Sequence, residues 1–405
     1  MMPNEYRNFK KALAGIKDQD ERDRMSRLPR EERTLKKKLL LFQFVMVAIC
    51  ATLTIVSLEV ITRVFAPTWL TQRMLDLNRP PGAQTFGSDQ GWKVEIKNGH
   101  FWRFTPHSEF DVTHFEYNNK AHIDEYGGRV TASADGAENK DFVPFLGDSF
   151  TFGIGVADTE TFASLLSSIA SPRRVLNLGV PATALYDQLN IVEIRHDELG
   201  RPKKYVFFFF IGNDFTDLMK LKPVTPWKLD TFVSASPLGH SYLLQFVRRQ
   251  ALDAINWLTY GPHLDSTFSI MNSENNSYRG AAEAALQEQI NRLTQMRRKL
   301  GFSALLVVIP SREQTNSRLR NAKLSENDIP ESFIDVLLPN RILREQTNGH
   351  ELALVDPTVC ITEHNADGSL YYTQDNHFTA KGHKVFADCI REDIAKFLGN
   401  RKSNP

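Results

Sequence analysis

The chain has 405 residues, of which 41% are hydrophobic, and it carries a formal net charge of +1. This length and apolar content suffice for a sizeable core, and the near-neutral balance excludes a protein that binds nucleic acid through overall charge. No Cys/His cluster has zinc spacing, and neither a phosphate loop nor a dinucleotide fingerprint is present, so we expect no metal and no cofactor.

The N-terminal part predicts a membrane anchor. Residues 1–38 contain 12 Lys/Arg against 7 Asp/Glu, a net of +5 that leaves −4 for the remainder, and we expect a cytoplasmic basic tail. Residues 39–58 carry no charge, and as a helix they would span about 30 Å, the thickness of a bilayer core. We therefore predict a transmembrane helix over residues 39–62.

The charges before this helix set its orientation. The tail ends in three lysines, Lys36 to Lys38, and such flanks stay in the cytoplasm. A cleaved signal peptide would orient the chain in the same way, but no Ala-x-Ala-like site follows the apolar run, which favours an uncleaved anchor. The expected location is the bacterial inner membrane, with one pass and a periplasmic or otherwise extracytoplasmic C-terminal part.

The remainder alternates between strand-like and helix-like patterns. Residues 63–140 mix Gly, Asn, Pro and aromatic residues, which predicts an irregular β-rich lead-in. Five short apolar runs follow, at 142–146, 175–178, 205–211, 304–309 and 352–355, with helical patterns between them. This alternation predicts an α/β fold over residues 141–400, a three-layer flavodoxin-like sandwich with about five parallel strands.

One connection is longer than a simple crossover requires. Residues 215–276 predict a helical insertion between the third and fourth strands. Within it, residues 242–258 are apolar and compatible with a helix that either lines a substrate pocket or packs away from it.

Glycine and polar residues follow the first three apolar runs, and two further polar residues precede the last helical pattern. They are Gly147-Asp148-Ser149, then Gly179, then Gly212-Asn213-Asp214, and finally Asp375 and His377. Parallel sheets place their sites at the carboxyl ends of strands, and a nucleophilic serine needs a base, an acid and oxyanion donors. Each motif alone has a structural explanation, such as N-capping by Asp148 and Ser149. Their joint occurrence favours an active site.

These four blocks resemble those of the SGNH/GDSL hydrolase superfamily, over residues 141–398. The resemblance implies that Ser149 is the nucleophile, that His377 is the general base and that Asp375 orients it. It also implies an oxyanion hole formed by the N–H groups of Ser149 and Gly179 and by the side-chain amide of Asn213.

The acid departs from the usual pattern of the superfamily. The acid and base are usually spaced Asp-x-x-His, whereas one residue separates Asp375 from His377. Asp367 is the alternative acid. His383, which follows shortly after, is predicted to lie on a helix surface or to act as a cap.

We therefore expect a serine esterase that hydrolyses acyl esters, with O-acetyl groups on envelope or exported carbohydrate as the expected substrate and Ser149 as the site of an acyl-enzyme. A glycan O-acyltransferase that uses the same intermediate is the alternative, and it would require a multi-pass partner to deliver acyl groups across the membrane. The third hypothesis is a catalytically inactive glycan-binding or assembly protein, which only the short Asp-x-His spacing favours. No nucleic-acid partner is expected.

The three cysteines leave one question open. Cys50 lies in the apolar run, so Cys360 and Cys389 remain on the exported side, where a disulfide is permitted. A disulfide and two buried thiols both fit the sequence.

Overall fold

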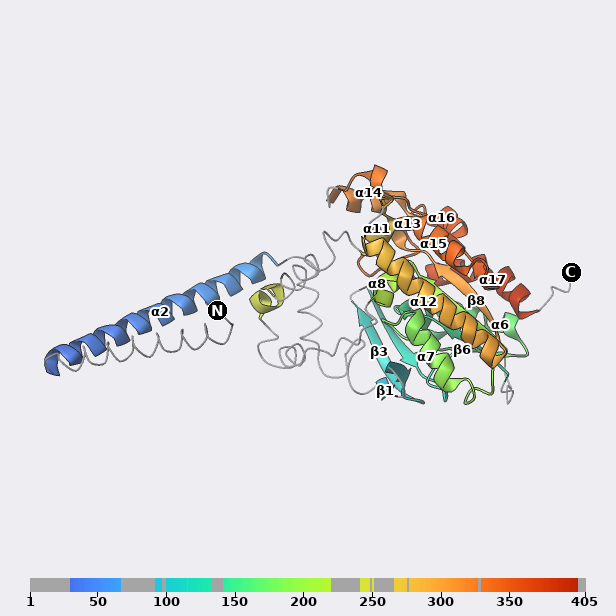
Figure 1. Cartoon of the computed structure of the whole chain (residues 1–405), viewed down its shortest axis with the longest axis horizontal. Coiled ribbons are helices and arrows are strands. Elements are labelled where there is room, and N and C mark those ends of the chain that lie inside the picture. Colours follow the sequence, from blue (N-terminus) through green and yellow to red (C-terminus); the bar gives the residue numbers. More distant parts are fainter. Residues whose placement is uncertain are drawn as a thin grey trace, which may run out of the picture. The chain divides into compact units, whose positions relative to one another are not determined.

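The computed structural model describes residues 30–66, 92–96, 100–114, 116–132, 141–219, 241–247, 250, 266–274, 277–326 and 329–399. Contacts divide the chain (Figure 1) into two compact units, residues 1–74 with 237–249 and residues 75–236 with 250–405. The predicted tail lies mostly outside the described residues.

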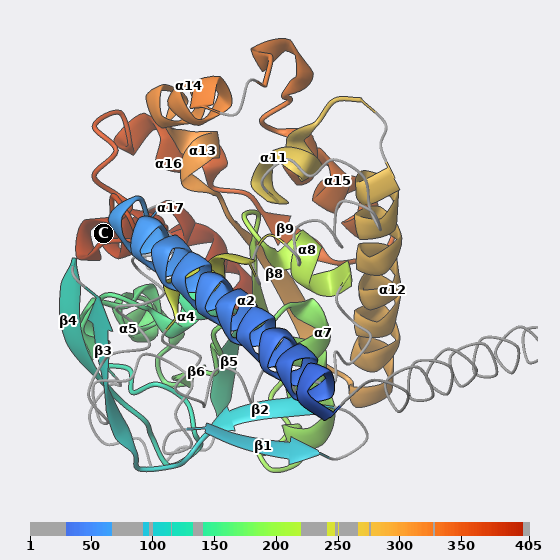
Figure 2. The ribbon, with the colours of Figure 1, turned by 90° about the vertical axis from the view of Figure 1, so that its left-hand side faces the viewer.

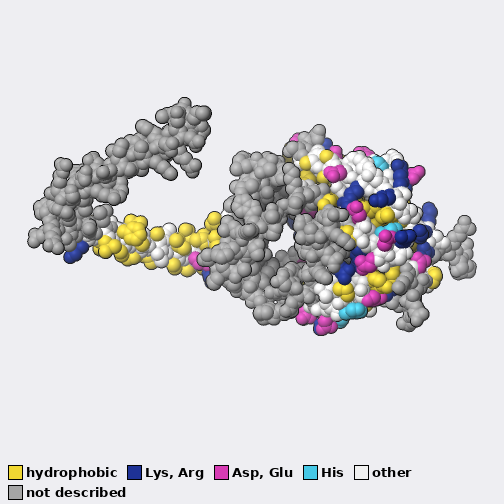
Figure 3. Space-filling model, turned by 60° about the horizontal axis from the view of Figure 1, so that its bottom comes forward, with side chains coloured by type: hydrophobic (Ala, Val, Ile, Leu, Met, Phe, Trp, Pro, Cys, Tyr) yellow, Lys and Arg dark blue, Asp and Glu magenta, His cyan; other side chains and the backbone are white. Residues whose placement is uncertain are grey.

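The first unit contains a long apolar helix, α2 (Arg30–Val64). Its stretch Leu41–Val64 has a mean hydropathy of 2.4, and its most apolar part is not buried by the rest of the protein. Apolar side chains cover the helix surface (Figure 3), with charged residues near its ends. At ~1.5 Å per residue, 24 residues span about 36 Å, so this helix is long and apolar enough to cross a membrane.

The same unit holds residues 241–247 of the predicted insertion, which are helical over 242–247, whereas the described ends of the insertion, at 215–219 and 266–274, belong to the second unit. Glu59 of α2 accepts hydrogen bonds from the backbone N–H groups of Tyr242 and Leu243, at 3.0 and 2.9 Å. A carboxylate at this position satisfies the unpaired donors of a helix start. The start of this segment is thus bonded to α2; residues 220–240, 248–249 and 251–265 lie outside the described chain.

The second unit is built on a parallel sheet. Its strands are β5 (Phe142–Leu146), β6 (Arg174–Asn177), β7 (Lys204–Phe210), β8 (Ser303–Ile309) and β9 (Ala353–Val355), and their order is β6-β5-β7-β8-β9. All four neighbouring pairs are parallel. The five predicted runs coincide with these strands to within one residue at each end, and the α/β fold with five parallel strands is confirmed.

Helices cover both faces of the sheet (Figure 2) because successive strand residues point to opposite sides. Phe207 and Phe209 of β7 pack with α7 (Leu185–Arg195), α12 (Ser277–Leu300) and α15 (Leu338–Thr347). Val206 and Phe208 pack with α5 (Phe162–Leu165), α16 (Thr358–His364) and α17 (Ala380–Leu398). Among the described residues, the other α-helices of this unit are α4 (Ser149–Phe152), α6 (Ser167–Ala170), α8 (Asp214–Met219), α11 (Ser266–Met271), α13 (Arg312–Thr315) and α14 (Ser317–Glu326).

The lead-in before the sheet contains two antiparallel hairpins. One pairs β1 (Trp92–Ile96) with β2 (His100–Phe104), and the other pairs β3 (Glu109–His114) with β4 (Tyr117–His122). Beyond them, the N–H of Arg129 donates to the carbonyl of Asn177, the last residue of β6, at 2.8 Å. The buried Arg129 side chain binds Asp158 at 2.7 Å and the carbonyl of Val156 at 2.6 Å. The lead-in is therefore joined to the sheet by backbone and side-chain bonds.

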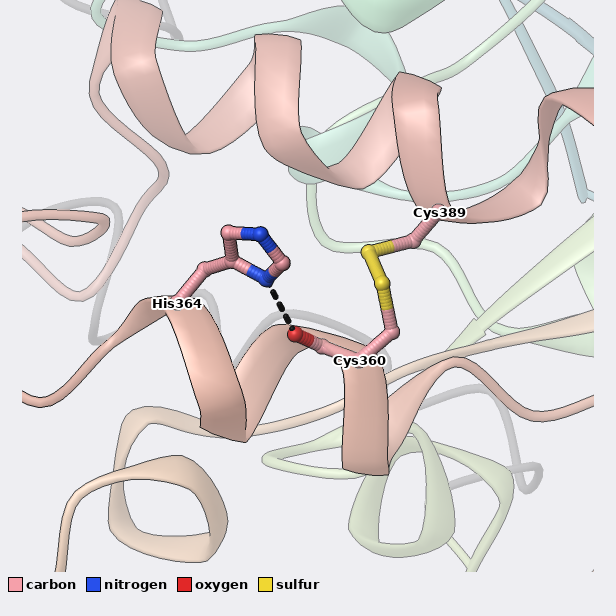
Figure 4. A group of neighbouring side chains, drawn as sticks. All are labelled: Cys360, His364 and Cys389. Carbon is pink, nitrogen blue, oxygen red and sulfur yellow. Dashed lines mark hydrogen bonds between the residues drawn. A yellow bond between two sulfur atoms is a disulfide. The ribbon is translucent and has the colours of Figure 1, made fainter.

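A disulfide joins Cys360 of α16 to Cys389 of α17 (Figure 4), at a sequence separation of 29 and with Cα atoms 6.0 Å apart. Closing a loop of this length stabilises the folded state by about 3.6 kcal/mol in the chain-entropy account. His364 lies beside the bond, and its Nδ1 contacts the carbonyl of Cys360 at 2.8 Å. The donor atoms of these three residues lie within 4.8 Å of one another, but the disulfide occupies both sulfurs.

His383 corrects one prediction, because it is buried and not on a helix surface. Its Nδ1 accepts the N–H of Phe162 at 3.2 Å, and Thr379 is the residue that caps α17. Helix α17 packs this turn against α5, which places the imidazole among aromatic rings. Burial, together with the charges of Arg129 and His377, lowers the pKa of His383 to about 3.

This shift predicts a pH dependence of stability. The unfolded pKa of histidine is about 6.5, so between pH 6.5 and 3 the unfolded state binds the extra proton and stability falls as pH decreases, by up to about 1.4 kcal/mol per pH unit. The variant His383→Asn keeps an acceptor for Phe162 but cannot titrate. We expect the unfolding free energy of this variant, measured in urea from pH 7 to 4, to change less with pH than that of the wild type. The difference in slope should be up to about 1.4 kcal/mol per pH unit, which corresponds to one proton. His364→Asn, at an exposed site, should leave the slope unchanged; equal slopes for His383→Asn and the wild type would contradict the assignment.

Candidate active site

Three of the predicted site segments lie at the carboxyl ends of neighbouring strands. Strand β5 ends at Leu146 and leads through Gly147 and Asp148 into α4, which begins at Ser149. Strands β6 and β7 flank β5 on its two sides, and Gly179 and Asn213 follow them. The chain turns to opposite sides of β5, so the serine lies at the switch point where open α/β sheets bind ligands.

The turn before the serine also has a structural role. Asp148 is the N-cap of α4, and its Oδ1 accepts the N–H of Phe150 at 2.9 Å. The N–H of Ser149 belongs to the first turn, where backbone donors have no partner within the helix. The capping explanation and the functional explanation therefore hold for the same turn.

Ser149, His377 and Asp375 form a hydrogen-bonded chain. The Oγ of Ser149 lies 2.8 Å from Nε2 of His377, and Nδ1 of the same ring makes a short hydrogen bond with Oδ1 of Asp375. Oδ1 also accepts the backbone N–H of His377 at 2.9 Å. One carboxylate oxygen thus serves both the backbone and the ring of a residue two positions on, which makes the short Asp-x-His spacing geometrically sufficient.

The charge of Asp375 is stabilised by its partners. Its side chain is 15% exposed, and burial alone would raise its pKa. The hydrogen bonds from His377 and Tyr117 and the charge of His377 outweigh burial and hold the pKa well below its usual range. Asp367 lies elsewhere: it is exposed and binds Ser369 and Lys381, at 2.7 and 3.2 Å. The structure brings Asp375, and not Asp367, to His377.

The amide of Asn213 is held by a neighbour on the next turn. Its Nδ2 donates to Oδ2 of Asp217 at 2.7 Å. Because a carboxylate only accepts, this bond decides which end of the amide carries the nitrogen. The second N–H of the amide remains for another acceptor. Within the described residues, the buried Oδ1 of Asn213 has no hydrogen-bond partner.

Gly179 is closer to the nucleophile turn than the sequence indicated. A Cβ at this position would lie 2.3 Å from the backbone nitrogen of Phe152, so only glycine fits. Its N–H donates to Oδ1 of Asn177 at 3.1 Å, while Nδ2 of Asn177 donates to the carbonyl of Thr151 at 2.8 Å. The family resemblance implies an oxyanion role for this N–H; an oxyanion would have to share it with Asn177.

Two buried acids lie next to these groups. Asp148 and Asp214 are both almost fully buried, and Oδ2 of Asp214 accepts the N–H of Phe210 at 3.0 Å. Burial raises the pKa of both carboxyls, and the nearby acids Asp148 and Asp217 raise that of Asp214 further. The sequence signals their turns but not their burial.

Sequence reasoning missed the residues that contact the acid from the lead-in. The hydroxyl of Tyr117 donates to Oδ2 of Asp375 at 2.7 Å across 258 positions of sequence. Glu116 accepts the backbone N–H groups of Thr373 and Asp375, each at 2.8 Å. No motif surrounds Glu116 or Tyr117, so no sequence signal marked them.

Comparison with known proteins gives structural matches only. No protein-family model and no curated protein matches the sequence. An acetyl xylan esterase covers 62% of this chain and 99% of its own, at 15% identity and a TM-score of 0.35. The match with a lipase/acylhydrolase from Enterococcus faecalis covers 65% of this chain and 99% of the other chain, at 14% identity and a TM-score of 0.34. The match with a member of the lipolytic G-D-S-L family from Veillonella parvula covers 62% of this chain and 96% of the other chain, at 10% identity and a TM-score of 0.35.

At these identities and TM-scores the matches assign no function to this chain.

Proposed function

We propose that the protein is a serine esterase of the SGNH type, which hydrolyses acyl esters through an acyl-enzyme on Ser149. The hydrogen-bonded chain from Ser149 through His377 to Asp375 is the observation that supports it most strongly. Ser149 lies 228 positions from His377 in the sequence, and each of the three side chains has the partner that its role requires.

In this mechanism, Oγ of Ser149 attacks the ester carbonyl while Nε2 of His377 takes its proton. The bond between the acyl carbon and the alcohol oxygen then breaks as His377 returns the proton to that leaving oxygen, which leaves the acyl group on Ser149. Water, deprotonated by the same imidazole, then releases the acid and restores the serine. Asp375 stays ionised throughout and holds the imidazole in the tautomer that accepts at Nε2.

The oxyanion of each tetrahedral intermediate needs donors beside Ser149. The N–H of Ser149 and the free N–H of the Asn213 amide are proposed for this role, with Gly179 contributing through the N–H that it shares with Asn177. Asp217 enters as the residue that holds the Asn213 amide in the donating orientation.

A double-mutant cycle tests the pair formed by Asn213 and Asp217. Loss of an oxyanion donor costs about 10² to 10³ in kcat, which we expect for Asn213→Ala. Asp217→Ala should cost about 10-fold, because the amide loses its orientation and not its donor. In the Asn213→Ala background the Asp217 substitution should have no further effect on kcat for 4-nitrophenyl acetate. Multiplicative losses would show that the two residues act independently.

O-acetyl esters of envelope or exported carbohydrate are the proposed substrate class. The proposal rests on the expected location, because helix α2 is long and apolar enough to hold the chain at a membrane. The tail before the apolar run carries +5, which favours a cytoplasmic N-terminus. A reporter enzyme that is active only outside the cytoplasm, fused after Pro405, should be active; activity of a cytoplasm-specific reporter at that position would refute this orientation.

Labelling with a fluorophosphonate tests the function itself. The Oγ of Ser149 would form a bond to phosphorus as fluoride leaves, with the proton going to His377. We expect labelling of the wild type and none of Ser149→Ala. Absence of labelling in folded wild-type protein would leave only the inactive, glycan-binding reading. With an acetyl ester and excess carbohydrate, release of acetate supports hydrolysis, and acetylated carbohydrate would instead indicate an acyltransferase.

A further inference from the structure

The lead-in hairpin β3–β4 contacts the loop that carries the proposed acid and base. Oδ1 of Asp375 is used by His377, and Oδ2 is used by the hydroxyl of Tyr117, at 2.7 Å. Both carboxylate oxygens thus have a hydrogen-bond donor, and the outer donor comes from the first residue of β4. Burial, followed by the charge of Asp375, raises the pKa of Tyr117 well above its usual value, so the phenol keeps its proton at neutral pH.

Glu116, in the turn just before β4, holds the backbone of the same loop. One oxygen accepts the N–H of Thr373 at 2.8 Å, the other accepts the N–H of Asp375 at 2.8 Å, and the N–H of Gln374 lies 3.1 Å from the second oxygen. Its side chain is 15% exposed. Successive N–H groups that point at one carboxylate form an anion-binding loop, so the charge of Glu116 fixes the backbone that leads into Asp375.

Further contacts attach the hairpin to the loop after the nucleophile helix. Asn119 donates from Nδ2 to the carbonyl of Gly155 at 2.6 Å, and the hydroxyl of Tyr372 donates to the same carbonyl at 2.7 Å. The rings of Tyr117 and Tyr372 pack with centroids 4.9 Å apart. The hairpin therefore bridges the serine side and the acid side of the site.

We infer that Glu116 and Tyr117 are positioning residues of the active site, which hold Asp375 against His377, and that the lead-in hairpin is part of the catalytic unit. This inference deepens the proposed function and rests on it. In an Asp-x-His pair the two residues are too close in sequence for the intervening chain to hold the carboxylate. Oδ1 of Asp375 is already bonded to both the backbone N–H and the ring Nδ1 of His377, so any further support must come from other groups. The hairpin supplies the remaining donor and the backbone support from outside the loop.

Kinetics of Tyr117→Phe and Glu116→Gln test the inference, with Tyr126→Phe as the matched control. Tyr126 belongs to the same lead-in, but its ring packs on Phe142 at the amino end of β5. Loss of a hydrogen bond to a charged group costs about 10- to 100-fold. We expect losses of this size in the rate constant of fluorophosphonate labelling and in kcat for 4-nitrophenyl acetate, with KM changed less than about 2-fold. Tyr126→Phe should match the wild type.

Two measurements separate positioning from general destabilisation. In the Asp375→Asn background, Tyr117→Phe should cause no further loss of kcat, because Tyr117 acts through Asp375. Hydrogen exchange of the amides at residues 373–375 should be faster in Glu116→Gln than in the wild type, since a neutral amide offers only one acceptor oxygen. Wild-type labelling rates in both variants, or unchanged exchange in Glu116→Gln, would overturn the inference. Faster exchange without any labelling of the wild type would refute the proposed function and leave the positioning intact.

Discussion

Replacing Ser149 with alanine is expected to lower kcat for acyl esters by about 10⁴- to 10⁶-fold and to leave KM within a few-fold. The reason is that the oxygen that attacks the carbonyl is lost while the binding surface remains. The oxyanion donors would still bind the carbonyl oxygen and support a slow reaction with water. The measurement is steady-state hydrolysis of 4-nitrophenyl acetate, with enzyme concentration high enough to detect the residual rate.

A matched serine controls for the substitution itself. Ser303 is exposed at the amino end of β8, and the site lies at the carboxyl ends of the strands. Ser303→Ala should therefore retain wild-type kcat and labelling. A Ser149→Ala protein that folds normally and still turns over the ester at a comparable rate would rule out the acyl-enzyme on this residue.

The second large effect concerns the acid. Asp375→Asn should lower kcat by about 10⁴-fold, because an amide can donate to Nδ1 of His377 and so stabilise the tautomer that cannot accept a proton at Nε2. The substitution also removes the negative charge that supports the imidazolium formed during attack. Folding should be largely kept, since the side chain has the same shape and its remaining oxygen, at the position of Oδ2, still accepts the hydroxyl of Tyr117.

Asp367→Asn is the control for this prediction. Asp367 is exposed and binds Ser369 and Lys381, so its substitution should leave kcat unchanged. An unchanged rate for Asp375→Asn together with a collapse for Asp367→Asn would reverse the assignment of the acid. Losses in both would indicate that the Lys381 contact supports the loop before His377.

The site could be located from sequence because its parts are local. Ser149 and Asn213 each occupy a turn directly after an apolar run. Such a turn places its side chains at the edge formed by the carboxyl ends of the strands, wherever the strand lies in the sheet. The five strands were predictable for the same reason, since a parallel strand buried on both faces is a continuous apolar run. The anchor follows from the length and composition of a single segment.

Burial and long-range contact could not be predicted in this way. His383 lies on the face of α17 that packs on α5, and Asp148 and Asp214 lie beneath the site, but their neighbours in sequence do not distinguish them from exposed residues. The N–H of Gly179 is taken by Asn177, a bond that depends on how closely β6 approaches the nucleophile turn. The pairing of Cys360 with Cys389 required α16 and α17 to be adjacent.

The sequence by itself determined the apolar helix, the parallel α/β architecture and the identity of the serine, amide and histidine in strand-end and helix-start contexts. Only the tertiary structure decided that Asp375, and not Asp367, contacts His377. It alone also showed that Glu116 and Tyr117 hold Asp375, because these two contacts join segments more than 250 residues apart. Local pattern specifies each strand and turn through side-chain periodicity and backbone preference. Which distant groups then come within hydrogen-bond distance depends on how the whole sheet, its helices and the lead-in hairpin pack together.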